Sequence, residues 1–243
     1  FASSEAMEEM DMILLSQQLR KAKVAAIFAD SGSIQGFAGE QKSAKGNFPG
    51  PVPVVLSDVQ DPDGLNRAKE CGATGVLLKG GNDGLRDLLE QAAQLGLDAV
   101  VQVESGDEVA KALEMDASTL IVSGTEAESM LELKELIPKQ KVVAARVDAM
   151  QAGNVEIEHG RALKEGGFQS ILMASACVGD SEDLPYAKWA IEELSSKASK
   201  EFKITGMTGH VNGHFGTGTF ERTTGEIAWQ RHNPTDKGES EDA

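Results

Sequence analysis

Short apolar runs alternate with longer stretches of helical periodicity between Pro51 and Ala176. Strands joined through helices of this length need crossover connections, so we predict that they are parallel. Each run is apolar at consecutive positions, which is typical of strands covered on both faces. Repeated units of this kind predict an α/β barrel of the TIM type with an outer ring of helices. The runs are Val52–Leu56, Thr74–Leu78, Ala99–Val103, Thr119–Val122, Val142–Ala145 and Ser170–Met173.

The chain before these repeats predicts a further helix over residues 6–23 and a buried strand, Lys23–Phe28. The stretch from Asp30 to Pro51 is rich in Gly, Ser and Lys, and we predict a long loop with a short helix inside it. Asp61 and Ser105 have the character of helix N-caps, because each is a short polar residue directly before a helical stretch.

Three regions are predicted along the chain: a barrel domain over residues 1–200, a β-rich extension over residues 201–232, and an acidic disordered tail over residues 233–243. Within the extension, Phe202–Met207 predicts a strand, and Thr219–Trp229 predicts a hairpin that turns at Thr224 and Gly225.

The composition of the chain limits which binding partners and which cellular compartment we expect. The chain has 243 residues and a formal net charge of −16, which argues against nucleic acid or an anionic membrane as its main partner. Only two cysteines occur, so a reducing compartment is expected. No apolar run approaches the roughly 20 residues that span a bilayer. The start Phe1-Ala-Ser-Ser4 resembles the site where plastid transit peptides are cut, so we expect the plastid stroma, or otherwise the cytoplasm.

Several motifs, in order, resemble the indole-3-glycerol phosphate synthases, plastid or bacterial enzymes with a phosphate-binding barrel. The similarity runs from about Ile13 to Leu194 and implies that the family's first strand has no counterpart here. The Phe202–Met207 segment or the 219–229 hairpin is then a candidate to fill the resulting gap. The motifs are Ala26-Ile-Phe-Ala-Asp30 with Ile34-Gln-Gly-Phe37, Pro53-Val-Val-Leu-Ser-Asp58, Ala68-Lys-Glu-Cys-Gly-Ala-Thr-Gly-Val-Leu-Leu78, Val101-Gln-Val-Glu104, and Gly166-Gly167 to Ser175.

The resemblance implies a ring closure with loss of carbon dioxide and water, yet most of the groups it needs are replaced. The family's third-strand lysine, a general acid, falls on Ser57, and its fifth-strand glutamate falls on Gln102. Each lost general acid or base costs about 10²–10⁴-fold in rate. Further positions are replaced by Gly124-Thr125, Ala145-Arg146-Val147 and Ala174, whereas Ser175 is kept.

Some charged side chains at the predicted strand ends are candidates for catalysis. Glu104, Asp58 and Arg146, with Asp148 nearby, lie where barrel enzymes carry catalytic residues. The resemblance places a phosphate site at Ser175 and Ala176, although the acids that follow would repel an anion. Lys79-Gly-Gly-Asn-Asp-Gly84 is either a phosphate cradle or a simple turn, and we favour the turn.

The remaining candidates concern metals and partners. His210 and His214 lack a helix and a third ligand, so we expect no metal site, and no motif indicates a cofactor. Phe220 and Trp229 on the predicted hairpin are candidates for contacting a protein partner.

Three readings of function follow. The favoured one is a non-catalytic barrel that serves as a structural or protein-binding subunit of a plastid assembly. The second is an active carbon–carbon lyase or isomerase, a carboxy-lyase of the synthase type acting on a phosphorylated small molecule. The third is a sensor that binds a phosphorylated or anthranilate-like metabolite without turnover.

Overall fold

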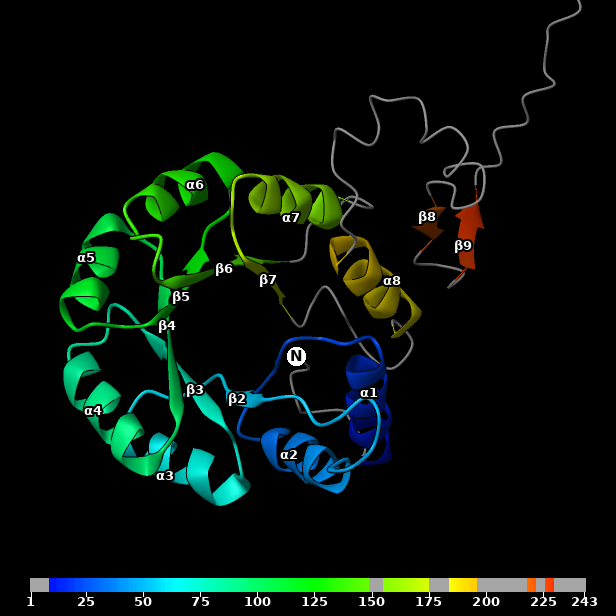
Figure 1. The fold of residues 1–243 in the computed structure, drawn as a ribbon, viewed down its shortest axis with the longest axis horizontal. Helices are drawn as coiled ribbons and strands as arrows, with labels where there is room; N and C mark the ends of the chain where they lie inside the picture. The colour runs from blue at the N-terminus through cyan, green and yellow to red at the C-terminus, as the bar shows by residue number, and fades with distance from the viewer. Residues whose placement is uncertain (1–8, 149–154, 175–183, 196–217, 222–225, 230–243) are drawn as a thin grey trace, which may run out of the picture. The chain divides into compact units, whose positions relative to one another are not determined.

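The structure is a computed structural model that describes residues 9–148, 155–174, 184–195, 218–221 and 226–229 (Figure 1). The chain divides into two compact units, Phe1–Leu194 and Ser195–Ala243. The domain boundary predicted at residue 200, the segment Phe202–Met207 and the acidic tail lie outside the described residues.

The first unit contains one parallel sheet of seven strands, paired in chain order from β1 to β7. This order confirms the predicted α/β class and the TIM-type arrangement, because each strand lies beside the next along the chain. The strands are β1 (Ile27–Ala29), β2 (Val54–Leu56), β3 (Gly75–Lys79), β4 (Asp98–Val103), β5 (Thr119–Ser123), β6 (Val142–Val147) and β7 (Ser170–Met173).

Helices alternate with these strands and cover the outer face of the curled sheet (Figure 1). A helix precedes each of the seven strands, and one more helix follows β7. The helices are α1 (Glu9–Lys21), α2 (Ile34–Ser43), α3 (Pro62–Cys71), α4 (Leu85–Leu95), α5 (Gly106–Glu114), α6 (Ala127–Glu135), α7 (Val155–Glu165) and α8 (Leu184–Ser195).

Alternate residues of each strand point to opposite faces, so the sheet has two apolar layers. The outer layer packs against the helices and includes Val76 and Leu78 of β3. The inner layer contains no helix residue and includes Leu77, which lies between Val76 and Leu78 along β3. Its buried members are Val55, Leu77, Val100 and Ile121, with Ala26, Phe28, Ala144 and Leu172 partly buried around them.

The sheet has two edges within the described residues, because β1 pairs there with β2 alone and β7 with β6 alone. The partly exposed inner residues Phe28 and Leu172 lie on these two edge strands, whereas the fully buried ones lie on β2 to β5. Among the described residues the parallel sheet therefore has seven strands, one fewer than the eight of a complete TIM barrel.

The short helix predicted inside the stretch from Asp30 to Pro51 is confirmed as α2, a helix of 10 residues in the first half of that stretch. Ile34, Phe37, Ala38 and Gln41 are buried along one face of this helix, at the spacing that an amphipathic helix requires. A Cβ at Gly36 would lie 3.4 Å from Met12 Cε of α1, in ordinary van der Waals contact.

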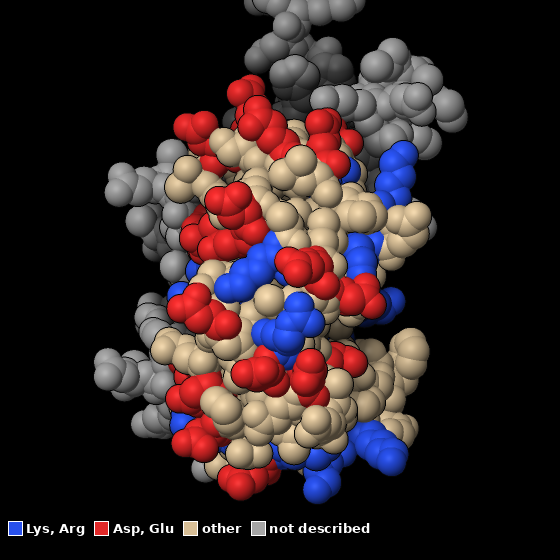
Figure 2. Space-filling view, turned by 90° about the vertical axis from the view of Figure 1, so that its left-hand side faces the viewer, with Lys and Arg blue, Asp and Glu red and all other residues tan. Residues whose placement is uncertain are grey.

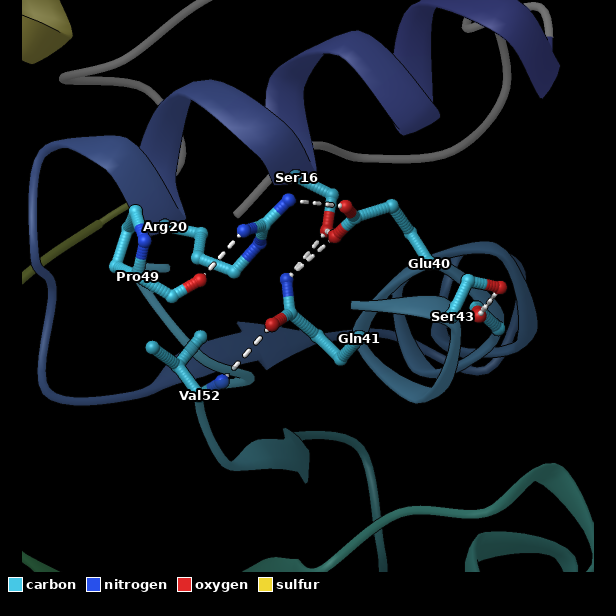
Figure 3. A network of polar contacts seen from close by, with 8 residues as sticks. Ser16, Arg20, Glu40, Gln41, Ser43, Pro49 and Val52 are labelled. Atoms are coloured by element: carbon cyan, nitrogen blue, oxygen red, sulfur yellow. Dashed lines mark hydrogen bonds and ion pairs between the residues drawn. The ribbon is translucent and has the colours of Figure 1, made fainter. Parts of the chain in front are cut away.

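A buried polar network joins α1, α2 and the chain that follows α2 (Figure 3). Glu40 accepts hydrogen bonds from Ser16 Oγ at 2.8 Å and from Arg20 Nη2 at 2.9 Å. Arg20 Nη1 also donates to the carbonyl of Pro49, and Gln41 Oε1 accepts from the backbone N–H of Val52 at 2.8 Å. The network therefore fixes the segment that leads into β2.

The predicted helix ends are confirmed where the structure tests them. Asp61 accepts a hydrogen bond from the backbone N–H of Gly64, and Ser105 accepts one from that of Glu108. Gly72 and Gly96 end α3 and α4 with φ angles of 82° and 68°, in the left-handed region that favours glycine.

The second unit contains an antiparallel pair, β8 (Gly218–Glu221) and β9 (Glu226–Trp229), within the predicted hairpin. Phe220 lies opposite Ile227, and Trp229 lies opposite Gly218. The role of Phe220 and Trp229 in binding a partner stays a prediction.

The outer helical face carries mixed charges, with acidic side chains interspersed among basic ones (Figure 2). Four acidic residues on and just before α6 are exposed to solvent: Glu126, Glu128, Glu132 and Glu135. Within the described residues, no helix is long and apolar enough to cross a membrane.

Candidate functional site

The carboxyl ends of the strands bring several polar side chains to one end of the barrel. Each of them is two residues beyond an inward apolar residue of its own strand, so the pleat turns it to the inner face. We call this end the barrel mouth and define it by the inward residues Ser57, Lys79, Gln102, Ser123 and Arg146.

Ser57 and Gln102, which stand in place of the family's lysine and glutamate, are both held by internal hydrogen bonds. Ser57 Oγ donates to the carbonyl of Ala29 on β1 at 2.9 Å. Gln102 is 8% exposed, and its Nε2 donates to Glu104 Oε1 at 3.0 Å. Neither an amide nor a hydroxyl bound to a carbonyl is a useful acid or base near neutral pH. Neither side chain is therefore available as a proton donor or acceptor for catalysis.

Glu104 lies at the mouth just beyond β4, as predicted, and is exposed. Its carboxylate accepts the hydrogen bond from Gln102, while its backbone N–H donates to Glu108 Oε2 at 2.7 Å. The Glu108 side chain thus reaches back over the start of α5. It bonds Glu104, which precedes the N-cap Ser105 by one residue, whereas in a capping box it would bond the N-cap itself. Glu104 is an accessible carboxylate that is oriented by its own strand.

Asp58 lies beyond the end of β2 and is engaged with the neighbouring strand's loop. Its Oδ2 accepts from the backbone N–H of Ser31 at 3.2 Å and from Ser31 Oγ at 2.5 Å. These bonds fasten the loop after β1 to the loop after β2. Asp58 therefore has a structural role that explains its presence without any chemistry.

Arg146 forms an ion pair with Asp148, two residues further along the chain. Asp148 Oδ1 accepts from Arg146 Nε and Nη2, each at 2.9 Å. Among the described residues, no hydrogen bond or ion pair joins Asp58, Glu104 and Arg146 to one another. The three predicted candidates share the mouth but are not a linked catalytic group.

Two mouth residues, Lys79 and Ser123, were missed as site residues from the sequence. Lys79 was assigned to a turn, but it ends β3 and pairs in register with Gln102. The predicted apolar run Thr119–Val122 stopped at Val122, whereas β5 continues to Ser123, which pairs in register with Arg146. Strand parity would have found both, because each follows an inward residue by two positions.

The glycine-rich turn after Lys79 is built for structure and not for holding phosphate. The backbone N–H of Gly80 donates to the Gln102 carbonyl at 2.7 Å, and that of Asn82 donates to the Lys79 carbonyl at 3.1 Å. The N–H of Gly84 donates to Asn82 Oδ1 at 2.8 Å. With these donors occupied, the turn has little left to offer an anion.

Other predicted site residues lie outside the described part of the chain. They are Ser175 and Ala176 of the expected phosphate site, and His210 and His214 of the disfavoured metal site. Within the described residues, no group of three His, Cys, Asp or Glu side chains comes together to hold a metal ion.

Comparison with known proteins agrees with the resemblance seen in the motifs. The chain is 26% identical over 179 residues to an indole-3-glycerol phosphate synthase from Chlorobium chlorochromatii, an alignment that covers 68% of this chain and 67% of that protein. No protein-family model matches the chain.

Solved structures share the fold at low sequence identity. A structure described as native KDPGal has a TM-score of 0.62 at 12% identity and covers 77% of this chain and 89% of its own. Orotidine 5'-phosphate decarboxylase from Pyrococcus horikoshii has a TM-score of 0.59 at 15% identity, covering 79% of this chain and 97% of its own. Thiamine phosphate pyrophosphorylase from Pyrococcus furiosus has a TM-score of 0.54 at 13% identity, covering 76% of this chain and 91% of its own.

The TIM-type arrangement of strands, the order of the motifs and this weak sequence similarity agree with one another. The chain is therefore a TIM-type α/β barrel with weak, divergent homology to indole-3-glycerol phosphate synthase.

Proposed function

We propose that this barrel does not catalyse the synthase reaction and serves as a structural or protein-binding subunit of a larger assembly. One observation carries the proposal: Ser57 and Gln102 replace the expected acid and base, and internal hydrogen bonds occupy both side chains. A scaffold that keeps its apolar layers while losing its proton-transfer groups retains a surface for binding and no means of turnover.

The assembly part of the proposal is tested by isolating the native protein from cells under mild conditions. Co-purification with fixed partners at constant stoichiometry, with cross-links that map to this chain, is the expected result. Recovery of the protein alone, at the hydrodynamic size of one chain, would contradict it. The plastid location stays a prediction, and imaging of the tagged native protein tests it separately.

A second candidate, an active carbon–carbon lyase or isomerase of shifted specificity, is favoured by the polar groups that the mouth still holds. Lys79 and Glu104 are a cation and a carboxylate on neighbouring strands, and Arg146 adds a second cation. These residues supply charge where barrel enzymes place catalytic groups. Turnover of a phosphorylated substrate that is lost in both Lys79→Met and Glu104→Gln would favour this candidate over the first.

A further inference from the structure

The hydroxyl of Ser123 is a buried polar group with no hydrogen-bond partner in the described structure. Ser123 is 7% exposed, and its Oγ is among the few buried side-chain atoms left unbonded. Leaving such a group unpaired costs stability, so an unpaired one calls for an explanation, such as a ligand. Its place on the inner face at the end of β5 directs the hydroxyl into the barrel mouth.

Two cationic side chains share this face with Ser123. Lys79 ends β3 and is exposed, and its side chain makes no hydrogen bond or ion pair with the described residues. Arg146 pairs in register with Ser123, and only its Nε and one Nη contact Asp148. A guanidinium has five N–H donors, so Arg146 keeps others for a second acceptor.

The acidic groups at the mouth limit what can bind there. Glu104 accepts a hydrogen bond from the neutral Gln102 amide and keeps its charge, whereas the charge of Asp148 is offset by Arg146. The acids Asp30 and Asp58, which follow β1 and β2, accept hydrogen bonds within the loops after those strands. The donors without acceptors are therefore concentrated on β3, β5 and β6.

We propose that Lys79, Ser123 and Arg146 form a binding site for a small anion that carries a carboxylate or a phosphate group. The ammonium and guanidinium supply charge-assisted hydrogen bonds, and the Ser123 hydroxyl donates a third. The site differs from the phosphate position expected at Ser175 and Ala176, because it is built from β3, β5 and β6. It goes beyond the proposed subunit role and requires no turnover.

Calorimetric titration of the full chain tests the site with two probes, inorganic phosphate and malonate. We expect at least one probe to bind with a dissociation constant of about 1 mM or tighter. Lys79→Met and Ser123→Ala should each weaken that binding by about 10-fold or more. Lys139→Met, which removes an exposed lysine from the loop after α6, is the matched control and should leave the affinity unchanged.

The melting temperature of the unliganded variants separates a binding role from a structural one. Ser123→Ala removes an unbonded hydroxyl, so its melting temperature should stay the same or rise. Ser16→Ala removes an equally buried hydroxyl that bonds Glu40 and Gln41, so its melting temperature should fall.

Three results would overturn the site: failure of both probes to bind at about 10 mM, wild-type affinity in Lys79→Met and Ser123→Ala, or a melting temperature for Ser123→Ala as low as that of Ser16→Ala. None of these results bears on the proposed subunit role, which the native purification tests.

Discussion

At the scale of single residues, the most demanding feature is the buried ion pair between Arg20 and Glu40. Their side chains are 9% and 6% exposed, and the atoms are 2.9 Å apart. Taking two charges out of water is costly, and the pair compensates only because Ser16, Gln41 and the Pro49 carbonyl add hydrogen bonds. Arg20 Nε is nevertheless left without a partner in the described structure.

Removal of one member of the Arg20–Glu40 ion pair should therefore destabilise the protein strongly. Glu40→Leu would leave the Arg20 charge buried without its counter-ion, and we expect a loss of about 3–5 kcal/mol in the free energy of unfolding. Urea denaturation measures it. Asp116→Asn, which breaks the exposed ion pair with Lys141, is the control and should change little. Equal effects of the two substitutions would show that the buried network is not what stabilises α1 against α2.

His159 predicts a pH dependence of stability. Burial lowers the pKa of His159, whose Nε2 is buried without a partner in the described structure. As the pH falls, the unfolded chain therefore binds a proton at His159 before the folded protein does. The folded protein keeps its full stability with respect to His159 above a pH of about 6.5, and its free energy of unfolding declines as the pH falls below that value. His159→Leu should flatten the fall in melting temperature between about pH 6.5 and pH 5. An unchanged profile would contradict the assignment.

At the scale of elements, glycines divide into those that permit close contact and those that do not. Gly75 of β3 faces the backbone of β4, and a Cβ there would lie 2.6 Å from the Asp98 carbonyl oxygen. Gly39 of α2 is the opposite case, because a Cβ there would meet nothing within 4 Å. The same chemical change should therefore have opposite signs at the two positions.

Gly75→Ala should destabilise the protein by forcing β3 and β4 apart. Gly39→Ala should stabilise it by about 0.5–1 kcal/mol, since alanine is the better helix former. Paired urea denaturation curves measure the two changes. A stabilising Gly75→Ala would mean that β3 and β4 are not as close as the structure has them.

Element types were predictable where local chemistry and periodicity agree. Asp61 and Ser105 mark helix starts through hydrogen bonds within three residues, so the sequence alone was sufficient to predict them. Helix α2 was predicted only as a short helix without bounds inside a loop, because glycine lowers the local helix propensity of this stretch. Lys79 and Ser123 were missed because the predicted strands ended at Leu78 and Val122. The strands β3 and β5 each continue for one more residue, and that residue faces inward.

At the scale of the whole molecule, the order of motifs predicted the barrel, and the loss of the synthase chemistry stays a prediction. The inner layer is buried in the middle of the sheet and partly exposed at β1 and β7. A parallel sheet with two edges should be least stable at those edges, because the outer strands have one neighbour each in the described structure.

Hydrogen exchange should follow this gradient. Backbone amides of β3, β4 and β5 should exchange slowest, and those of β1 and β7 fastest among the strands. Mass spectrometry of the exchanged, digested protein resolves these segments. Protection at β1 and β7 as strong as at β4 would contradict an open sheet and indicate that another strand covers the edges.

The central claim, loss of the synthase chemistry, is tested most directly by assaying the purified chain for indole-3-glycerol phosphate formation beside an authentic synthase. We expect no product above the rate in buffer, because the acid and base positions hold Ser57 and Gln102. Product formation well above that rate, lost again in Glu104→Gln or Lys79→Met, would contradict the account.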